Sequence, residues 1–396
     1  MAGIRKTIDT ALGAAVFATL ALGVTSAARA WDEQVLYSFT GGVDGQQPWA
    51  GVTLDAAGNV YGAVTFAGAS ENCGPSGCGN LYKVTPDGTF SVLHNFNWDD
   101  GANPASDLVL DKMTGNLYGT TLSGGSGGAG TIFRLAPTGG LTTLYSFTGG
   151  ADGNTPEGRL LRTKRGDIYG TTYGGGAKSQ GTVFKLATDG TETVLHSFAG
   201  GATDGTNPTN AGLAMDASGN LYGMAQFGGV SDYGIVFRLT EAGKFKVLHS
   251  FAGGTDGRYP AAGLVIDTAG NLYGTTQGGG GNDSCTYGCG TAFKMAPDGS
   301  VTILHGFAGG SDGANPLATL VRTKKGTLFG TTNDGSKGTV FEVKPNGHER
   351  VLHTFGGAGD GFEPQTGVTR GSDGSLYGTT DLGGASGLGT VYVLKK

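Results

Sequence analysis

The amino-acid sequence predicts an all-β protein, a seven-bladed β-propeller whose blades are four-stranded antiparallel sheets. Three observations predict it. One motif occurs seven times, each copy contains four short β-rich segments, and the first and last segments are incomplete copies that complement each other. Four antiparallel strands repeated seven times are the signature of a propeller. An open solenoid is the alternative.

Each repeat is about fifty residues long and carries the same landmarks. In the fifth copy they read HSFAGGTDGRYPAAGLVIDTAGNLYG: a phenylalanine that closes a strand, an Asp-Gly pair, a proline and an aromatic-Gly pair. The closing phenylalanines are Phe39, Phe96, Phe147, Phe198, Phe251, Phe307 and Phe355. The copies fill the chain after residue 30, so we expect a single domain over residues 31–396.

The four predicted strands of the fifth copy are AGLVID, NLYGTT, GTAFKM and VTILHGF. Tight-turn sequences, TAG and APDGS, join the first strand to the second and the third to the fourth. None of the segments has a sustained helical period, which favours a β structure throughout.

The two ends of the repeat region predict how the ring closes. VLYSF near residue 35 is a fourth-type strand with no partners before it, and GTVYVLKK at the end is a third-type strand with no fourth strand after it. Pairing the two completes the last blade and removes the exposed sheet edges that an open array would leave. We therefore expect the N-terminal strand to belong to the seventh blade.

Residues 1–30 have the pattern of a secretory signal peptide. Arg5 and Lys6 precede the apolar run ALGAAVFATLALGV, and the segment ends in Ala28-Arg29-Ala30. This three-part order is typical of a cleaved signal; an uncleaved anchor is the alternative. We expect a secreted, periplasmic or cell-surface protein, monomeric and without a membrane span in the mature chain.

The four cysteines form two local pairs inside Gly-rich insertions, Cys73 with Cys78 and Cys285 with Cys289. In an oxidising compartment this spacing favours one disulfide per pair. A four-cysteine zinc site would require the insertions of repeats one and five to meet, and a propeller keeps those repeats apart.

The net charge of −6 argues against nucleic acid as a partner, because a phosphate-binding surface needs a basic stripe. Strand alternation places both tight turns on one face of the disc. The inter-blade linkers and the Gly-rich loops after YGTT lie on the other face, with both cysteine insertions. Binding sites are commonly built on variable loops held by a rigid scaffold, so we expect any ligand there.

The aspartates of the linkers are Asp44, Asp100, Asp152, Asp204, Asp256, Asp312 and Asp360. Calcium needs six to eight oxygen ligands, and equivalent points on neighbouring blades should lie about 10 Å apart. We therefore interpret these aspartates as turn residues that accept backbone N–H bonds, and predict no metal and no cofactor. An isolated calcium at Asp99 and Asp100 in NWDDGANP is the alternative.

One position of the fourth strand is His94, His196, His249, His305 or His353, and is Tyr37 or Tyr145 in the other copies. Exchange between His and Tyr suits a planar group that packs and makes one hydrogen bond. It does not suit an acid–base catalyst, whose pKa must match the working pH. These histidines are predicted to be structural.

A functional site in a repeat protein should appear as departures from the repeat. After each proline the consensus is two small residues and glycine; the exceptions are Trp49, Asp107, Glu157, Arg159, Asn210, Thr319 and Gln365. They start the innermost strands, so they should rim the central channel. All but Thr319 are our ligand-binding candidates, and no residue is predicted to be catalytic.

Two of these exceptions have a simpler interpretation. Asp107 and Arg159 hold the same position in adjacent repeats, which predicts an inter-blade salt bridge. Trp49 with polar neighbours could stack on a sugar, or it could merely fill the mouth of the channel.

The string VLHSFAGGTDGRYPAAGLVIDTAGNLYGTTQGGG followed by GTAFKMAPDG resembles the Gloeo-Verruco (GloVer) tandem repeat of exported bacterial proteins. The shorter string GLVIDTAGNLYG is also similar to the NHL-type propeller blade. The resemblance covers the whole chain after residue 30. It implies an exported or surface protein and carries over no catalytic residues.

The sequence thus predicts an exported, non-catalytic propeller that binds an extracellular glycan or a surface protein through its loop face. The alternative is a secreted hydrolase or lyase acting on a carbohydrate or lactone at the channel mouth. Convergence of Asp107, Glu157, Arg159 and Asn210 in one pocket would favour the enzyme, whereas isolated pairs would not.

Overall fold

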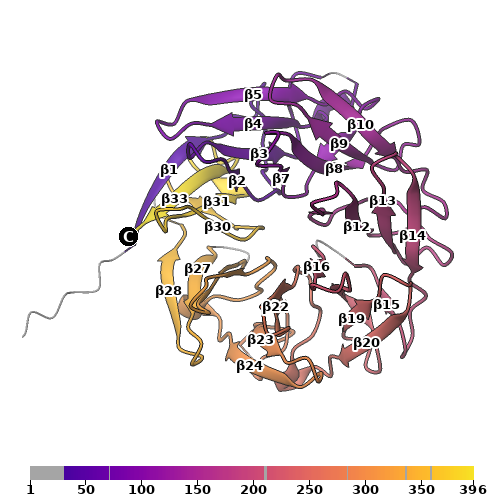
Figure 1. The fold of residues 1–396 in the computed structure, drawn as a ribbon. Helices are drawn as coiled ribbons and strands as arrows, with labels where there is room; N and C mark the ends of the chain where they lie inside the picture. Colours follow the sequence, from indigo (N-terminus) through magenta and orange to yellow (C-terminus); the bar gives the residue numbers. More distant parts are fainter. Residues whose placement is uncertain (1–30, 71, 209–211, 283, 335–336, 357–358) are drawn as a thin grey trace, which may run out of the picture. The chain divides into compact units, whose positions relative to one another are not determined.

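The computed structural model describes residues 31–396, apart from residues 71, 209–211, 283, 335–336 and 357–358. The predicted signal peptide lies outside the described residues. Residues Trp31–Lys396 form one compact unit, in which seven small sheets follow one another around a ring (Figure 1). The predicted seven-bladed propeller is confirmed.

Each blade is an antiparallel sheet, and in the first six blades the strands are paired in chain order from the centre outward. The first three blades consist of β2 (Thr53–Leu54), β3 (Val60–Val64), β4 (Asn80–Val84) and β5 (Phe90–Asn95); β7 (Val109–Leu110), β8 (Leu117–Ser123), β9 (Thr131–Leu135) and β10 (Leu141–Ser146), with β6 (Ala102–Pro104) also paired to β8; and β11 (Leu161–Arg162), β12 (Ile168–Thr172), β13 (Thr182–Leu186) and β14 (Glu192–Ser197).

The next three blades repeat the pattern. They consist of β16 (Ala214–Met215), β17 (Leu221–Ala225), β19 (Ile235–Leu239) and β20 (Phe245–Ser250); β21 (Val265–Ile266), β22 (Leu272–Thr276), β23 (Thr291–Met295) and β24 (Val301–Gly306); and β25 (Val321–Arg322), β26 (Leu328–Thr332), β27 (Thr339–Val343) and β28 (Glu349–Thr354).

The seventh blade contains both ends of the described chain. It consists of β30 (Thr369–Arg370), β31 (Leu376–Thr380), β33 (Thr390–Lys395) and the N-terminal β1 (Asp32–Ser38). β1 pairs antiparallel with β33, from Asp32 opposite Lys395 to Ser38 opposite Thr390. The predicted ring closure is confirmed.

Short elements decorate the linkers and loops. Two additional two-stranded ladders pair β15 (Gly205–Thr206) with β18 (Phe227–Gly228) and β29 (Gly361–Phe362) with β32 (Leu382–Gly383). Three 3₁₀ turns cover Gly74–Ser76, Gly254–Asp256 and Gly310–Asp312. Within the described part of the chain, no helix has the length and apolarity needed to cross a membrane.

The core lies between neighbouring blades. All seven closing phenylalanines are at most 2% exposed, and each packs against an aromatic ring of the next blade, as Phe198 does against Phe237 at 5.4 Å. The glycine of each aromatic-Gly pair makes room for that ring, since a Cβ on Gly223 would lie 2.5 Å from Phe237 Cζ. The glycine recurs in each repeat because the aromatic ring on the neighbouring strand occupies the space that a side chain would need.

The linker aspartates are turn residues, as predicted. In the fifth repeat, Oδ2 of Asp256 accepts the N–H of Ala252 at 2.8 Å. The same oxygen lies 3.0 Å from His249 Nε2. In the first repeat, Asp44 likewise accepts the N–H of Thr40 and the hydroxyl of Tyr37. The histidine or tyrosine of the fourth strand thus makes the hydrogen bond that was predicted for it.

Both predicted disulfides are present. Cys73 bonds to Cys78 and Cys285 bonds to Cys289, and each bond has a Cα–Cα distance of 5.2 Å. Each bond closes a loop on the linker side of its blade, so the covalent restraints act on the face where we expect a ligand.

Candidate functional site

A cavity of about 270 Å³ lies where the innermost strands begin. Blades one, two, three, six and seven all contribute to its wall, which places it at the centre of the ring. Six of the seven repeat exceptions line it: Trp49, Asp107, Glu157, Arg159, Thr319 and Gln365. The seventh, Asn210, lies outside the described residues. Departures from the repeat therefore converge on one site.

Trp49 is held in a defined orientation at this cavity. Its indole Nε1–H donates to Oδ1 of Asp381 at 2.8 Å. The ring also meets Phe66 edge to face, with centroids 5.0 Å apart. The side chain is half-buried, so part of the ring is available to the cavity while the other part is fixed by the protein.

Asp381 belongs to the loop between β31 and β32 and is only 6% exposed. Burial raises the pKa of Asp381 to about 6; the Trp49 hydrogen bond opposes this rise and the negative charge of Glu363 adds to it. Asp381 is not among the candidates that the exceptions after each proline gave. The signal was its position directly after YGTT, where the other copies have Thr65, Leu122, Tyr173, Gln226, Gln277 and Asn333.

Asp107 binds the backbone of the preceding blade. Its Oδ1 accepts the N–H of Gly51 at 2.7 Å. The same contact recurs between blades five and six, where Gly263 N–H donates to Thr319 Oγ1 at 2.8 Å. Side chains at this position therefore link the inner ends of neighbouring blades.

The predicted salt bridge between Asp107 and Arg159 is wrong. Over the described residues, neither side chain has an oppositely charged group within 4.0 Å. The physical reason is that the Asp107 carboxylate already accepts the Gly51 N–H on the side away from Arg159. Arg159 remains exposed, and its guanidinium has neither an ion-pair nor a hydrogen-bond partner among the described residues.

The wall of the cavity thus combines unlike groups. It offers an aromatic face from Trp49, carboxylates from Asp107 and Glu157, a guanidinium from Arg159, and the amide of Gln365. An aromatic surface surrounded by hydrogen-bonding groups suits a polar ligand that has an apolar face.

The fold and this central cavity define the class: a β-propeller repeat protein with a polar site on the axis of its linker face. The chain belongs to the Gloeobacter/Verrucomicrobia repeat family, which matches residues 65–287 and 282–396. The resemblance inferred from the sequence is confirmed. No curated protein matches the sequence.

Solved structures share the fold at low identity. Virginiamycin B lyase from Staphylococcus aureus superposes with a TM-score of 0.59 at 11% identity, covering 92% of this chain and 99% of the lyase. A catalytically inactive form of that lyase with quinupristin gives 0.58 at 14% identity and the same coverage.

The extracellular domain assigned to a one-component system of B. thetaiotaomicron also has a similar fold. It gives a TM-score of 0.57 at 11% identity, covering 92% of this chain and 40% of that chain. At these identities the likeness shows the propeller fold alone.

Proposed function

We propose that this chain is an exported, non-catalytic propeller that binds the end of an extracellular glycan in its central cavity. One observation carries the proposal: six independent departures from the repeat, Trp49 and Arg159 among them, line the same cavity. A cavity of about 270 Å³ is close to the lower end of the roughly 300–1,000 Å³ typical of ligand sites. It suits a terminal sugar rather than a long chain.

The chemistry of the wall supports a sugar. The face of a pyranose ring packs on an aromatic side chain, and its hydroxyls need donors and acceptors around the edge. Arg159 adds an exposed guanidinium, which binds carboxylates well, so acidic sugars belong in the test. A surface protein is the alternative partner; a stable protein interface buries roughly 1,200–2,000 Å², so such a partner would need the wider loop face and not the cavity alone.

The exported location is part of the proposal. The predicted signal segment at residues 1–30 and the two disulfides support it, because disulfides persist in oxidising compartments and both cysteine pairs are bonded.

A secreted hydrolase or lyase is the second candidate. In its favour, Asp107, Glu157 and Arg159 line one cavity. Against it, Asp107 is engaged by the Gly51 N–H. Asp381, whose pKa is raised to about 6, is bonded to Trp49 and does not line the cavity. We therefore rank binding above catalysis.

The test is a calorimetric titration of the protein with neutral and uronic-acid oligosaccharides. We expect binding that is lost in Trp49→Ala and retained in Trp98→Ala, because Trp98 is 42% exposed and lies outside the cavity. Equal affinity in both variants would contradict a site at Trp49. Release of product from a glycoside or lactone, lost in Glu157→Gln, would favour the enzyme instead.

A further inference from the structure

The junctions between neighbouring blades share one arrangement away from the central cavity. The His or Tyr of one fourth strand meets the linker aspartate, and a residue at the start of the next blade's fourth strand faces this pair. At two junctions that residue is an aromatic ring: Phe90 stacks on Tyr37 at 4.1 Å, and Phe245 stacks on His196 at 3.9 Å. At three junctions it is a glutamate, namely Glu33, Glu192 or Glu349.

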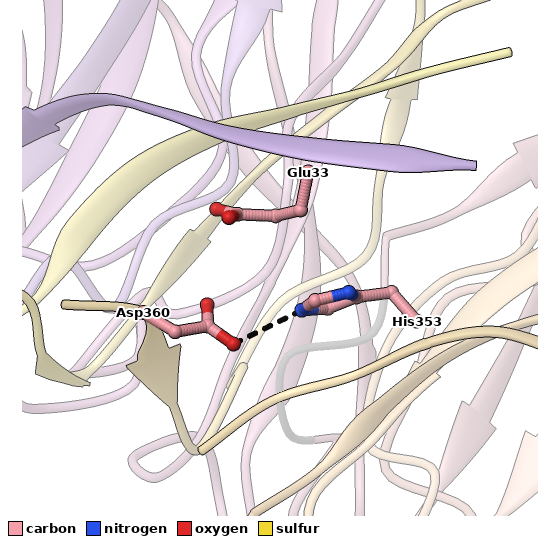
Figure 2. Close-up of side chains that lie close together, drawn as sticks. All are labelled: Glu33, His353 and Asp360. Atoms are coloured by element: carbon pink, nitrogen blue, oxygen red, sulfur yellow. Dashed lines mark hydrogen bonds and ion pairs between the residues drawn. The ribbon is translucent and has the colours of Figure 1, made fainter. Parts of the chain in front are cut away.

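Two of the glutamate junctions bring three potential metal ligands together. Glu33 on β1 reaches His353 on β28 and Asp360 of the following linker (Figure 2). His353 Nε2 lies 3.1 Å from Asp360 Oδ2. All the ligand atoms of this cluster lie within 4.8 Å of one another, although Glu33 and Asp360 are far apart in the sequence.

The second cluster repeats the first one blade earlier. It consists of His305, Asp312 and Glu349, whose ligand atoms also lie within 4.8 Å of one another. His305 Nε2 is 3.1 Å from Asp312 Oδ1. The same chemistry is therefore built twice, by equivalent residues.

In each cluster the glutamate is only half-buried, but one of its two carboxylate oxygens is enclosed. Oε1 of Glu33 and of Glu349 is sealed from solvent and has no hydrogen-bond partner. Burial, and then the negative charge of the adjacent aspartate, raises the pKa of each glutamate to about 7. A cation placed between the two carboxylates would offset their mutual repulsion.

We propose that these two junctions are binding sites for a divalent transition-metal ion, with Zn²⁺ as the matching ion. One imidazole and two carboxylates are ligands that Zn²⁺ accepts, and a fourth position stays open for water. Zinc–ligand distances of about 2.0–2.2 Å place ligands roughly 3.4 Å apart in a tetrahedron, so small side-chain rotations would close each cluster. Calcium fits poorly because it needs six to eight oxygens.

The proposal revises the prediction that the chain holds no metal. The spacing of about 10 Å separates equivalent positions of neighbouring blades, but Glu33, His353 and Asp360 occupy three different positions of the repeat. An ion here would tie the closing strand β1 to blade six, next to the seam of the ring. The proposed role is therefore to lock the ring.

The chain supplies its own control at the third glutamate junction. There Glu192 faces Tyr145 and Asp152, and Tyr145 donates its hydroxyl to Asp152 at 3.1 Å. Oε1 of Glu192 is also buried and unpartnered, and burial, followed by the charge of Asp152, raises the pKa of Glu192 to about 7. It lacks the imidazole, so we expect no transition-metal binding at this junction.

The experiment is a calorimetric titration of the untagged, EDTA-treated and dialysed chain with ZnCl₂. We expect two ions per chain, one per chain in Glu33→Gln and in Glu349→Gln, and two in Glu192→Gln. A wild-type chain that takes up no zinc, or a stoichiometry unchanged in Glu33→Gln and Glu349→Gln, would overturn the proposal.

Two further measurements keep the test independent of folding defects. His353→Tyr places a residue that other copies use at this position, as at Tyr37 and Tyr145, and should fold while losing one ion. Zinc should also raise the melting temperature of the wild-type chain, because a ligand bound to the folded state alone stabilises it. No shift at saturating zinc would contradict the proposed role in locking the ring.

Discussion

Replacing Trp49 with phenylalanine should destabilise the protein in a pH-dependent way. The substitution keeps an aromatic ring beside Phe66 but removes the Nε1–H that donates to Asp381 at 2.8 Å. Asp381 is 6% exposed, so its carboxylate would lose this donor without gaining much water. A hydrogen bond to a charged group contributes about 1.5–3 kcal/mol, and one to a neutral group about 0.5–1.5 kcal/mol.

The sign of the pH dependence follows from the raised pKa of Asp381. Burial moves this pKa from 3.8 to about 6, so the folded protein binds the proton more tightly than the unfolded chain does. The stability that protonation of Asp381 contributes is complete below about pH 4 and is lost as the pH rises through 6. Removing the Trp49 donor raises the pKa further, so the loss of stability in Trp49→Phe should grow with pH.

The magnitude can be measured as a melting temperature by far-UV circular dichroism. An unfolding entropy of about 2.1 cal/mol/K per residue amounts to roughly 0.8 kcal/mol/K for residues 31–396. Trp49→Phe should therefore lower the melting temperature by about 2–4 °C at pH 8 and by about 1–2 °C at pH 4.

Asp381→Asn is the matched control because it removes the titrating group and keeps the shape. In the Asp381→Asn background, the effect of Trp49→Phe should be the same at pH 4 and pH 8. If Trp49→Phe alone shows no pH dependence, or if Asp381→Asn leaves that dependence intact, the reasoning is refuted.

Three further substitutions test the packing between blades, each by melting temperature. Tyr82→Phe should raise it by about 1–4 °C, because the buried hydroxyl has no partner among the described residues and such a group costs about 1–3 kcal/mol; a decrease would reveal a partner. Gly223→Ala should lower the free energy of unfolding by about 1–3 kcal/mol, and the melting temperature with it, because the added Cβ would lie 2.5 Å from Phe237. Its control, Gly140→Ala, should be nearly neutral, because no atom lies within 4 Å of that Cβ. Glu192→Gln should flatten the loss of stability between pH 5 and 8, because burial raises the Glu192 pKa from 4.5 to about 7; an unchanged slope would show that Glu192 does not titrate there.

Most of the fold could be predicted because its information is local and repeated. Strand alternation, the two tight turns and the closing phenylalanine lie within one copy of about fifty residues, and seven copies repeat the same evidence. The cysteine pairs could be predicted for the same reason, since their sequence separations are only five and four.

The site could be predicted only in part. Departures from the repeat identified Trp49, Glu157 and Arg159 as residues of the channel rim, and they do line one cavity. The same reasoning paired Asp107 with the wrong partner. Two side chains at equivalent positions of adjacent blades need not point toward each other. Here the Asp107 carboxylate accepts the backbone N–H of Gly51 instead.

The sequence by itself determined the architecture, the ring closure, the disulfides and the ring of candidate residues, because each depends on patterns within one repeat or on the repeat number. Only the tertiary structure decided which groups meet across blades. Trp49 and Asp381 are 332 residues apart and hydrogen-bonded, and Glu33 reaches His353 because β1 completes the seventh blade. Such contacts depend on where each side chain points after the ring has closed.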